Sequence, residues 1–310
     1  MRVLITCPPM LGLMEEFYPL FSVKDIEVDC PAVVQTLSVE ELKKLLPRYD
    51  AWIIGDDPAN EEVFKAGRAG RLKAAVKWGV GVDNVDFSAA KSLGIPIANT
   101  PNMFGMEVAD IAMGYVVGLA RQSYAVDRAV RSGNWIKPAG ISLAEKTVAL
   151  IGFGSIGHQT AKRLIAADMK VIVYDPKVDI SKKNNAVELA VWPERLDEAD
   201  FIVLTCALTA QNRHMLNSQT LGLSKPGVRI VNVARGPLID EAALIDCLRS
   251  GQVHSAALDV FEIEPLPVNS SLRKFEQCIF GTHNASNTVD AVRRASHQAV
   301  SLLFDFLGVG

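Results

Sequence analysis

The sequence predicts an α/β protein with two doubly wound parallel sheets. β-type and helix-type segments alternate along all 310 residues, which is the pattern of parallel strands joined by crossover helices. A long helix-type segment, 107–121, separates two such series. Hydrophobic residues make up 49% of the chain, and a chain of this length can bury two cores. We therefore expect two domains.

The first series predicts a sheet in the N-terminal part of the chain. A helix over 38–46 opens with the capping box Ser38-x-x-Glu41, and a second helix begins near Val85 and stops at Gly94. The expected strands are 2–7, 26–30, 51–55, 73–78 and 95–98.

The second series predicts a larger sheet. Helices are expected over 155–168 and 240–249, and apolar spacing predicts an amphipathic helix over 289–307. The expected strands lie near 147–151, 170–174, 201–205, 228–233, 255–260 and 278–282.

A G-x-G-x-x-G motif follows the first strand of the second series. Gly152 would allow the tight turn, Gly154 the approach of a pyrophosphate, and Gly157 close packing of helix on strand. Ser155 and Ile156 open the helix, whose free N–H groups would face the phosphates. The motif predicts a Rossmann cofactor domain.

The next strand ends in Asp175, where an acidic residue meets the adenosine ribose. A 2′-phosphate would be repelled by this carboxylate, so we expect NAD rather than NADP. Lys177, two residues further on, leaves a relaxed preference open.

Charge and cysteine usage limit the partners. The net charge is −3 and basic residues are scattered, so neither nucleic acid nor an anionic membrane is indicated, and a small molecule is expected. Five widely spaced cysteines, with no C-x-x-C, indicate neither disulfides nor a metal site. Without a signal peptide pattern or a membrane-length apolar run, we expect a cytoplasmic protein.

Three further segments fall at or just beyond predicted strand ends, where ligands bind in open α/β sheets. The glycines of Trp78–Asp83 could offer N–H groups to an anion as a nest. Asn232–Gly236 carries an arginine, and Asp259–Pro265 is followed later by Gly281-Thr282-His283. They predict a substrate cleft between the domains.

These motifs together resemble the D-2-hydroxyacid dehydrogenase family, including its D-3-phosphoglycerate dehydrogenase-like members. The quoted residues are V-G-V-D-N-V-D (80–86), N-T-P (99–101), V-A-D (108–110), G-F-G-S-I-G (152–157), N-V-A-R-G (232–236) and D-V-F-E-I-E-P (259–265). The resemblance implies hydride transfer between NAD(H) and C2 of a 2-hydroxy acid. The family usually has T-P-H where this chain has Gly281-Thr282-His283. The histidine is present, but glycine stands in place of the threonine and threonine in place of the proline.

Residue roles follow from the resemblance. It implies that Arg235 binds substrate, Glu264 orients the histidine and His283 is the general acid/base. It also implies substrate contacts from Val80 and Gly81 and cofactor contacts from Val233 and Asp259.

The resemblance implies a flavodoxin-like substrate domain of 1–98 and 288–310 and an NAD-binding domain of 99–287, with hinges near 99–101 and 284–287. It also places a homodimer contact along the apolar segment 111–119.

The chemistry explains the trio. Oxidising a C–OH carbon requires a base that titrates near neutrality, which favours histidine, and a carboxylate on its other ring nitrogen fixes the tautomer. Arginine offers a planar fork to a carboxylate. Glu262 competes with Glu264, and only the family spacing decides between them. The other histidines are expected to be structural or exposed: His158, which could also approach the pyrophosphate, His214, His254 and His297.

Two alternatives stay open. The chain could be an NAD(H)-sensing binding protein of the same fold, although we expect no tail for recruiting partners, or it could be a 3-phosphoglycerate dehydrogenase. The loop Gly55-Asp56-Asp57 is acidic where phosphoglycerate dehydrogenases offer an arginine. We therefore expect a substrate tail that is neutral, polyol-like or cationic.

Overall fold

The computed structural model describes residues 1–178 and 187–310. They form two compact units: unit 1 comprises Met1–Phe104 and Asn287–Gly310, and unit 2 comprises Gly105–Ser286. The first boundary falls at Phe104 rather than at residue 98. The reason is that Thr100 and Phe104 pack within unit 1, where Thr100 Oγ1 accepts the Gly79 N–H at 2.8 Å and the Phe104 ring lies 5.1 Å from that of Trp78.

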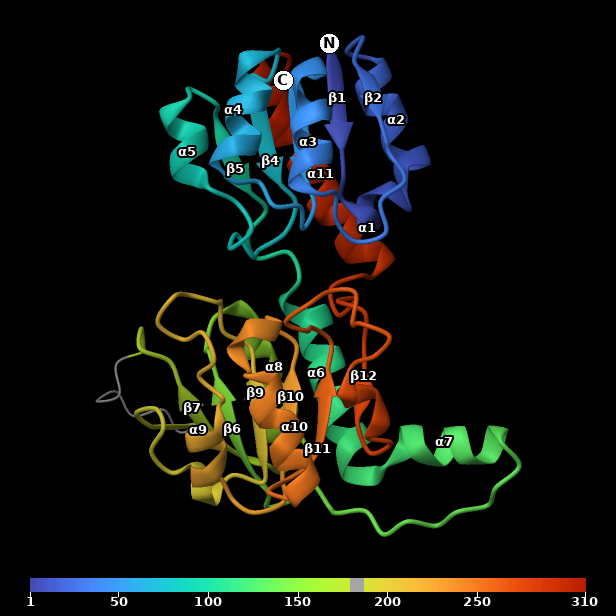
Figure 1. Cartoon of the computed structure of the whole chain (residues 1–310), viewed down its shortest axis with the longest axis vertical. Helices are drawn as coiled ribbons and strands as arrows, with labels where there is room; N and C mark the ends of the chain where they lie inside the picture. Colours follow the sequence, from blue (N-terminus) through green and yellow to red (C-terminus); the bar gives the residue numbers. More distant parts are fainter. Residues whose placement is uncertain (179–186) are drawn as a thin grey trace. The chain divides into compact units, whose positions relative to one another are not determined.

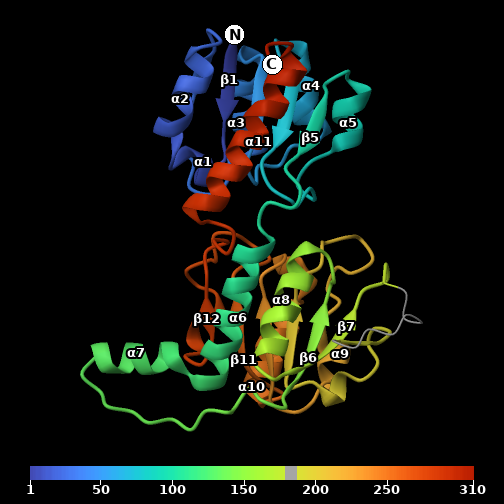
Figure 2. The same ribbon diagram turned by 180° about the vertical axis from the view of Figure 1, so that it is seen from behind.

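Unit 1 is a parallel sheet in the order β2-β1-β3-β4-β5. Its order reverses between β1 and β3, which is the predicted flavodoxin-like arrangement. The last helix, α11, covers one face, and α3 and α4 cover the other (Figures 1 and 2). The strands are β1 (Arg2–Ile5), β2 (Glu27–Asp29), β3 (Ala51–Ile54), β4 (Ala74–Lys77) and β5 (Ile97–Asn99).

The predicted signals are found at two helices of unit 1, α3 and α5, whereas α1, α2 and α4 were not predicted. The capping box is formed: the Ser38 hydroxyl accepts the Glu41 N–H at 3.3 Å, and the Glu41 carboxylate accepts the Ser38 N–H at 2.8 Å. Gly94, at φ +69°, follows the helix expected to stop there. The helices are α1 (Pro8–Leu11), α2 (Met14–Ser22), α3 (Val39–Leu45), α4 (Glu61–Ala69), α5 (Phe87–Ser92) and α11 (Val289–Leu307), with the 3₁₀ turn η1 (Leu46–Arg48).

Unit 2 is a parallel sheet in the order β12-β11-β10-β9-β6-β7-β8. Helices α6 and α8 lie together on one face, and α9 and α10 lie on the other (Figures 1 and 2). The two-residue edge strand β8 was not predicted, because a segment this short carries no periodicity. The strands are β6 (Thr147–Ile151), β7 (Lys170–Tyr174), β8 (Glu188–Leu189), β9 (Phe201–Leu204), β10 (Val228–Asn232), β11 (Val253–Leu258) and β12 (Ile279–Phe280).

The apolar segment 111–119 belongs to a helix that packs mainly inside unit 2. Tyr115, Val116 and Leu119 are buried there, while Ile111 and Val117 are each 37% exposed. The helices of this unit are α6 (Gly105–Arg121), α7 (Ser123–Arg131), α8 (Ser155–Ala166), α9 (Ser218–Leu223) and α10 (Glu241–Ser250), with 3₁₀ turns η2 (Leu196–Glu198), η3 (Gly236–Leu238) and η4 (Ser271–Lys274). In the described ranges, no helix has the length and apolarity needed to cross a membrane.

Candidate active site

The glycine turn after β6 has the geometry that the motif predicts. Gly152 lies at φ +94°, and a Cβ there would stand 2.6 Å from the Cys206 backbone. At Gly157 a Cβ would stand 2.1 Å from the Gly152 carbonyl oxygen, so the helix can lie this close only without a side chain. Gly154 faces open space. Ser155 is the first residue of α8 and Ile156 the second. The N-terminal amides of this helix therefore lie next to Gly154, where helix N-termini bind phosphates.

The switch point of the sheet lies at this turn, because the strand order reverses between β6 and β9. Thr205, directly after β9, is buried, and its hydroxyl donates to the Gly152 carbonyl at 2.8 Å. Sequence reasoning missed this bracing residue. Its position one residue beyond the end of a buried strand was the available signal.

Asp175 lies directly after β7. Its carboxylate accepts the Phe153 N–H at 2.7 Å and the Lys177 N–H at 2.8 Å. These contacts tie the carboxylate to the glycine turn. A carboxylate has about four acceptor positions, so the two amides leave acceptor capacity for ribose hydroxyls.

Glu264 and His283 meet as a pair. His283 Nδ1 lies 2.8 Å from one carboxylate oxygen of Glu264, and the other oxygen accepts the Phe261 N–H at 2.9 Å. The side chains are 22% and 20% exposed. Glu264 is therefore fixed at both oxygens and holds the His283 imidazole through Nδ1.

Arg235 lies in the loop after β10, next to the loop that carries Glu264. A Cβ on Gly236 would stand 1.9 Å from the Phe261 carbonyl group, so the two loops are in contact. Asn232 donates to the Arg235 carbonyl at 2.9 Å, which holds the turn. Val233, at the same strand end, is buried. Two of the three predicted segments thus meet at one edge of unit 2, and the third, Trp78–Asp83, lies in unit 1.

Asp259 holds the loop of the histidine. It is 2% exposed, and its carboxylate accepts the amides of Asn284 at 3.2 Å and Ala285 at 2.8 Å. The His283 N–H donates to the Asp259 carbonyl at 2.6 Å. Asp259 therefore anchors the residues around His283, whatever its contact with a cofactor.

The two candidate carboxylates contact different histidines. Glu262 contacts His214 Nε2, and Glu264 contacts His283. His214, expected to be structural or exposed, is therefore the partner of the competing glutamate. His158 is exposed and stacks on Phe153 with ring centroids 3.8 Å apart.

Val80 and Gly81 lie in unit 1, just after β4. The predicted nest is only partly available, because the Gly79 N–H donates to Thr100. Lys77, at the end of β4, is 2% exposed, and its ammonium donates to the Gly55 carbonyl at 2.6 Å and to Asp56 at 3.1 Å. Sequence reasoning did not identify this buried cation.

The expectation that Asp56 and Asp57 present an acidic surface to the substrate tail is wrong for Asp57. Its side chain is fully buried, where it accepts the Thr6 hydroxyl and the Leu37 N–H, the latter at 2.8 Å. Asp56 is paired with Lys77. The loop therefore has no net acidic face, because one carboxylate is internal and the other is neutralised.

The fold and the nucleotide turn define an NAD-dependent oxidoreductase, and comparisons with known proteins identify its family. A family model described as "D-isomer specific 2-hydroxyacid dehydrogenase, NAD binding domain" matches residues 113–285. The chain belongs to this family, whose members act on CH–OH donors. In the described ranges, no group of three His, Cys, Asp or Glu is placed to hold a metal ion.

Individual relatives support the same family. A hydroxypyruvate reductase from Thermotoga maritima is 37% identical over 88% of this chain and 90% of its own length. D-3-phosphoglycerate dehydrogenase 3 from Arabidopsis thaliana is 38% identical over 86% of this chain, which spans only 46% of that protein. The crystal structure of the TT0316 protein from Thermus thermophilus has a TM-score of 0.86 and 29% identity, covering 99% of this chain and 97% of that one.

Proposed function

We propose that the protein reduces a small 2-keto acid to a D-2-hydroxy acid, reversibly, with NADH. The observation that carries this proposal is the 2.8 Å contact between His283 Nδ1 and Glu264, beside the Arg235 loop at the carboxyl edge of the nucleotide-binding sheet. This arrangement supports the proposal, because it would bring an acid/base and a carboxylate-binding group together.

His283 is proposed to move the proton. In the reductive direction the protonated imidazole gives its Nε2 proton to the keto oxygen, while Glu264 holds the Nδ1–H and balances the imidazolium charge. In the oxidative direction the neutral imidazole takes the hydroxyl proton. NAD(H), when bound, supplies or accepts the hydride at C2 of the substrate.

Arg235 is proposed to hold the substrate carboxylate with its planar guanidinium and to polarise the C2 oxygen. Val80 and Gly81 are proposed to contact the substrate, and Val233 and Asp259 the nicotinamide side of the cofactor; the family resemblance supports these four roles. The glycine turn, closely packed at Gly152 and Gly157 and open at Gly154, fits a dinucleotide.

The substrate is proposed to be short and without a phosphate, of the hydroxypyruvate or glyoxylate kind. Support comes from the hydroxypyruvate reductase that matches over most of its length and from the loop in which Lys77 is already paired with Asp56. 3-Phosphoglycerate remains the alternative substrate, because D-3-phosphoglycerate dehydrogenase 3 is 38% identical over 86% of this chain.

Residues 1–104 with 287–310 are proposed to form the substrate domain and residues 105–286 the NAD-binding domain, with closure on cofactor binding. Small-angle scattering with and without NAD tests this closure, and unchanged curves would contradict it.

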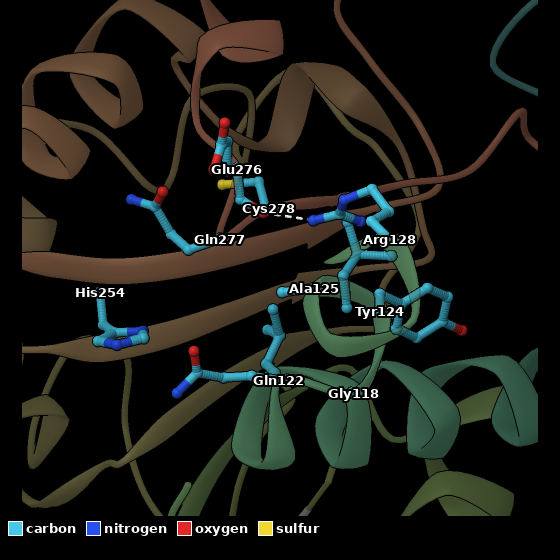
Figure 3. A pocket seen from close by; sticks show the side chains of 11 residues that line it. Gly118, Gln122, Tyr124, Ala125, Arg128, His254, Glu276, Gln277 and Cys278 are labelled. Atoms are coloured by element: carbon cyan, nitrogen blue, oxygen red, sulfur yellow. Dashed lines mark hydrogen bonds between the residues drawn. The ribbon is translucent and has the colours of Figure 1, made fainter. Parts of the chain in front are cut away.

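A homodimer is proposed, as the resemblance implies, but through other residues than the expected segment 111–119, which packs mainly inside unit 2. The proposed contact is α7 and the segment after it, which stand away from the rest of unit 2 (Figures 1 and 2). No residue of α7 is buried, and Trp135 beyond it is 80% exposed. A small pocket lies at the base of this arm, where Arg128 donates to the Glu276 carbonyl at 2.5 Å (Figure 3). Equilibrium sedimentation that gives a monomer at micromolar concentration would contradict the dimer.

A cytoplasmic location is also proposed, and the five free cysteines fit it.

The test is a steady-state screen of 2-keto acids with NADH, from glyoxylate and hydroxypyruvate to 3-phosphohydroxypyruvate. We expect the highest kcat/KM with an unphosphorylated acid. A phosphorylated acid that is better by more than about tenfold, which is about 1.4 kcal/mol, would replace the proposed substrate by the alternative. No turnover with any acid would favour the binding protein.

A further inference from the structure

A second histidine–glutamate pair adjoins the Glu264–His283 pair. His214 lies in the loop after β9, and its Nε2 contacts the carboxylate of Glu262. Glu262 is two residues before Glu264 on the same loop. The two side chains are 35% and 27% exposed, so the pair lies at the border of the site rather than on the open surface.

The main chain of Glu262 is held as well. Its N–H donates at 2.7 Å to the carboxylate of Glu241, in the first turn of α10. The preceding amide, that of Phe261, donates to Glu264. The consecutive amides of Phe261 and Glu262 thus each donate to a carboxylate. The side chain of Glu262 is held by His214.

His214 itself has a fixed position. Its backbone N–H donates to the Pro237 carbonyl at 2.8 Å, and its backbone carbonyl accepts the Asn217 side-chain N–H at 2.9 Å. Pro237 follows the Arg235-Gly236 turn. His214 therefore connects the arginine loop with the glutamate loop through its own backbone and ring.

Three carboxylates lie near the His214–Glu262 contact and influence one another electrostatically. Burial raises the pKa of the Glu241 carboxyl; the Glu262 amide acts in the opposite direction, while the Glu262 and Glu264 carboxylates raise the pKa further. Three carboxylates thus lie within electrostatic range of one another. The charged and titratable groups that these contacts place around Glu264 are His283, Glu262 with its partner His214, and Glu241.

We propose that His214 is a positioning residue of the dehydrogenase: by holding Glu262, it fixes the loop on which Glu264 orients His283. The inference rests on the proposed catalytic role of that pair. The proposal gives Glu262 a function, which is to connect His214 with the loop of Glu264, and it gives His214 a role in activity.

The test compares His214→Ala with His214→Gln. Both variants lack the imidazole, but glutamine retains a side-chain N–H that can reach Glu262, so the difference between them isolates the hydrogen bond. We expect the alanine variant to lose about 10- to 100-fold in kcat, the range for a misplaced catalytic group, with KM for NADH within about twofold of wild type. The glutamine variant should recover most of the loss.

The pH profile separates positioning from general loosening. With Glu264 less firmly held on His283, the imidazolium is less stabilised, so the reductive kcat of the alanine variant should fall at lower pH than that of the glutamine variant. His254→Ala, a histidine on β11 outside these loops, is the matched control and should leave both quantities unchanged.

An alanine variant whose kcat and pH profile match those of the glutamine variant would overturn the inference, even if its melting temperature falls. ¹⁵N NMR of the His283 ring gives a readout without substrate: the two His214 variants should differ at this ring, and identical spectra would overturn the inference. Failure of the wild-type enzyme to reduce any 2-keto acid would instead overturn the proposed function.

Discussion

Both sheets have a glycine at the switch point, on opposite sides of it, and use it differently. In unit 1, Gly55 follows β3 at the switch point, and a Cβ there would stand 2.7 Å from the Thr6 carbonyl oxygen. In unit 2, Gly152 follows β6 at the switch point, and a Cβ there would stand 2.6 Å from the Cys206 backbone. Both edges therefore need a glycine to bring two neighbouring strand ends together.

What lies beyond the glycine differs. In unit 1 the next polar groups are internal: Asp57 is fully buried and Lys77 is 2% exposed. In unit 2 the turn continues to the exposed Gly154, around which a Cβ would meet nothing. The same topology thus yields an edge filled by its own side chains and an edge left open to a ligand. The proposed catalytic residues follow strands of the sheet that carries the open turn.

The largest effect is expected from the acid/base at the open edge. His283→Ala should lower kcat by about 10²–10⁴-fold, because a positioned general acid contributes that much. Steady-state kinetics with saturating NADH measures it, and His297→Ala in unit 1 is the control. A rate near that of wild type would remove His283 from the mechanism.

Arg235→Lys should also be severe, although it preserves the charge, because an ammonium cannot reproduce the two parallel hydrogen bonds of the guanidinium. We expect kcat/KM for the keto acid to fall more than about tenfold, since a hydrogen bond to a charged group contributes about 1.5–3 kcal/mol. An unimpaired lysine variant would mean that Arg235 only solvates the strand end.

The glycines of the open edge sharpen the comparison. Gly157→Ala places a Cβ 2.1 Å from a carbonyl oxygen, so overpacking should lower the free energy of unfolding by about 1–3 kcal/mol. Gly154→Ala meets nothing within 4 Å, so it should preserve stability but weaken NADH binding, because the added methyl occupies the approach of the pyrophosphate. Thermal melts and fluorescence titrations with NADH measure the two effects. Equal stability losses in both variants would contradict the distinction.

Local signals in the sequence were sufficient for most of the fold and for part of the site. The G-x-G-x-x-G turn, the capping box at Ser38 and the last helix each depend on residues adjacent along the chain, and the structure shows all three as expected. The switch points follow from the strand order.

The contacts that the sequence did not predict join residues far apart along the chain. Asp57 was read as an exposed loop acid, but its carboxylate is bound by Thr6 and Leu37, residues 51 and 20 positions away. His214 meets Glu262 across 48 residues. No local pattern encodes such pairs, because the partner is brought in by the packing of different strands. The resemblance favoured Glu264 over Glu262, a choice that the residues alone did not make and that fits the contact with His283.

Cofactor choice should show a smaller effect at the open edge. A 2′-phosphate would stand against Asp175, and the imperfectly paired polar groups cost about 1–3 kcal/mol, so kcat/KM should favour NADH over NADPH by about 5- to 150-fold. Asp175→Ala should reduce this ratio. Equal efficiency of wild type with both cofactors would refute the role of Asp175 and draw attention to Lys177.

The smallest effect is expected at the filled edge, in the pH dependence of stability. Burial raises the pKa of Asp57 above its ordinary 3.8, although the Leu37 amide, Thr6, the Gly55 amide and Lys77 oppose the shift. A carboxyl whose pKa is higher in the folded chain than in the unfolded chain favours folding most when it is protonated. Its contribution is therefore complete below about pH 3.8 and decreases as the pH rises through the folded-state value. Asp57→Asn removes this titration, so the unfolding free energy of wild type relative to the variant should fall as the pH rises across that window. Urea melts at a series of pH values measure this difference, with Asp56→Asn as the partly exposed neighbour. A difference that is constant with pH would show that the buried carboxylate is as well stabilised as one in water, and the filled edge would then be no less suited to charge than the open one.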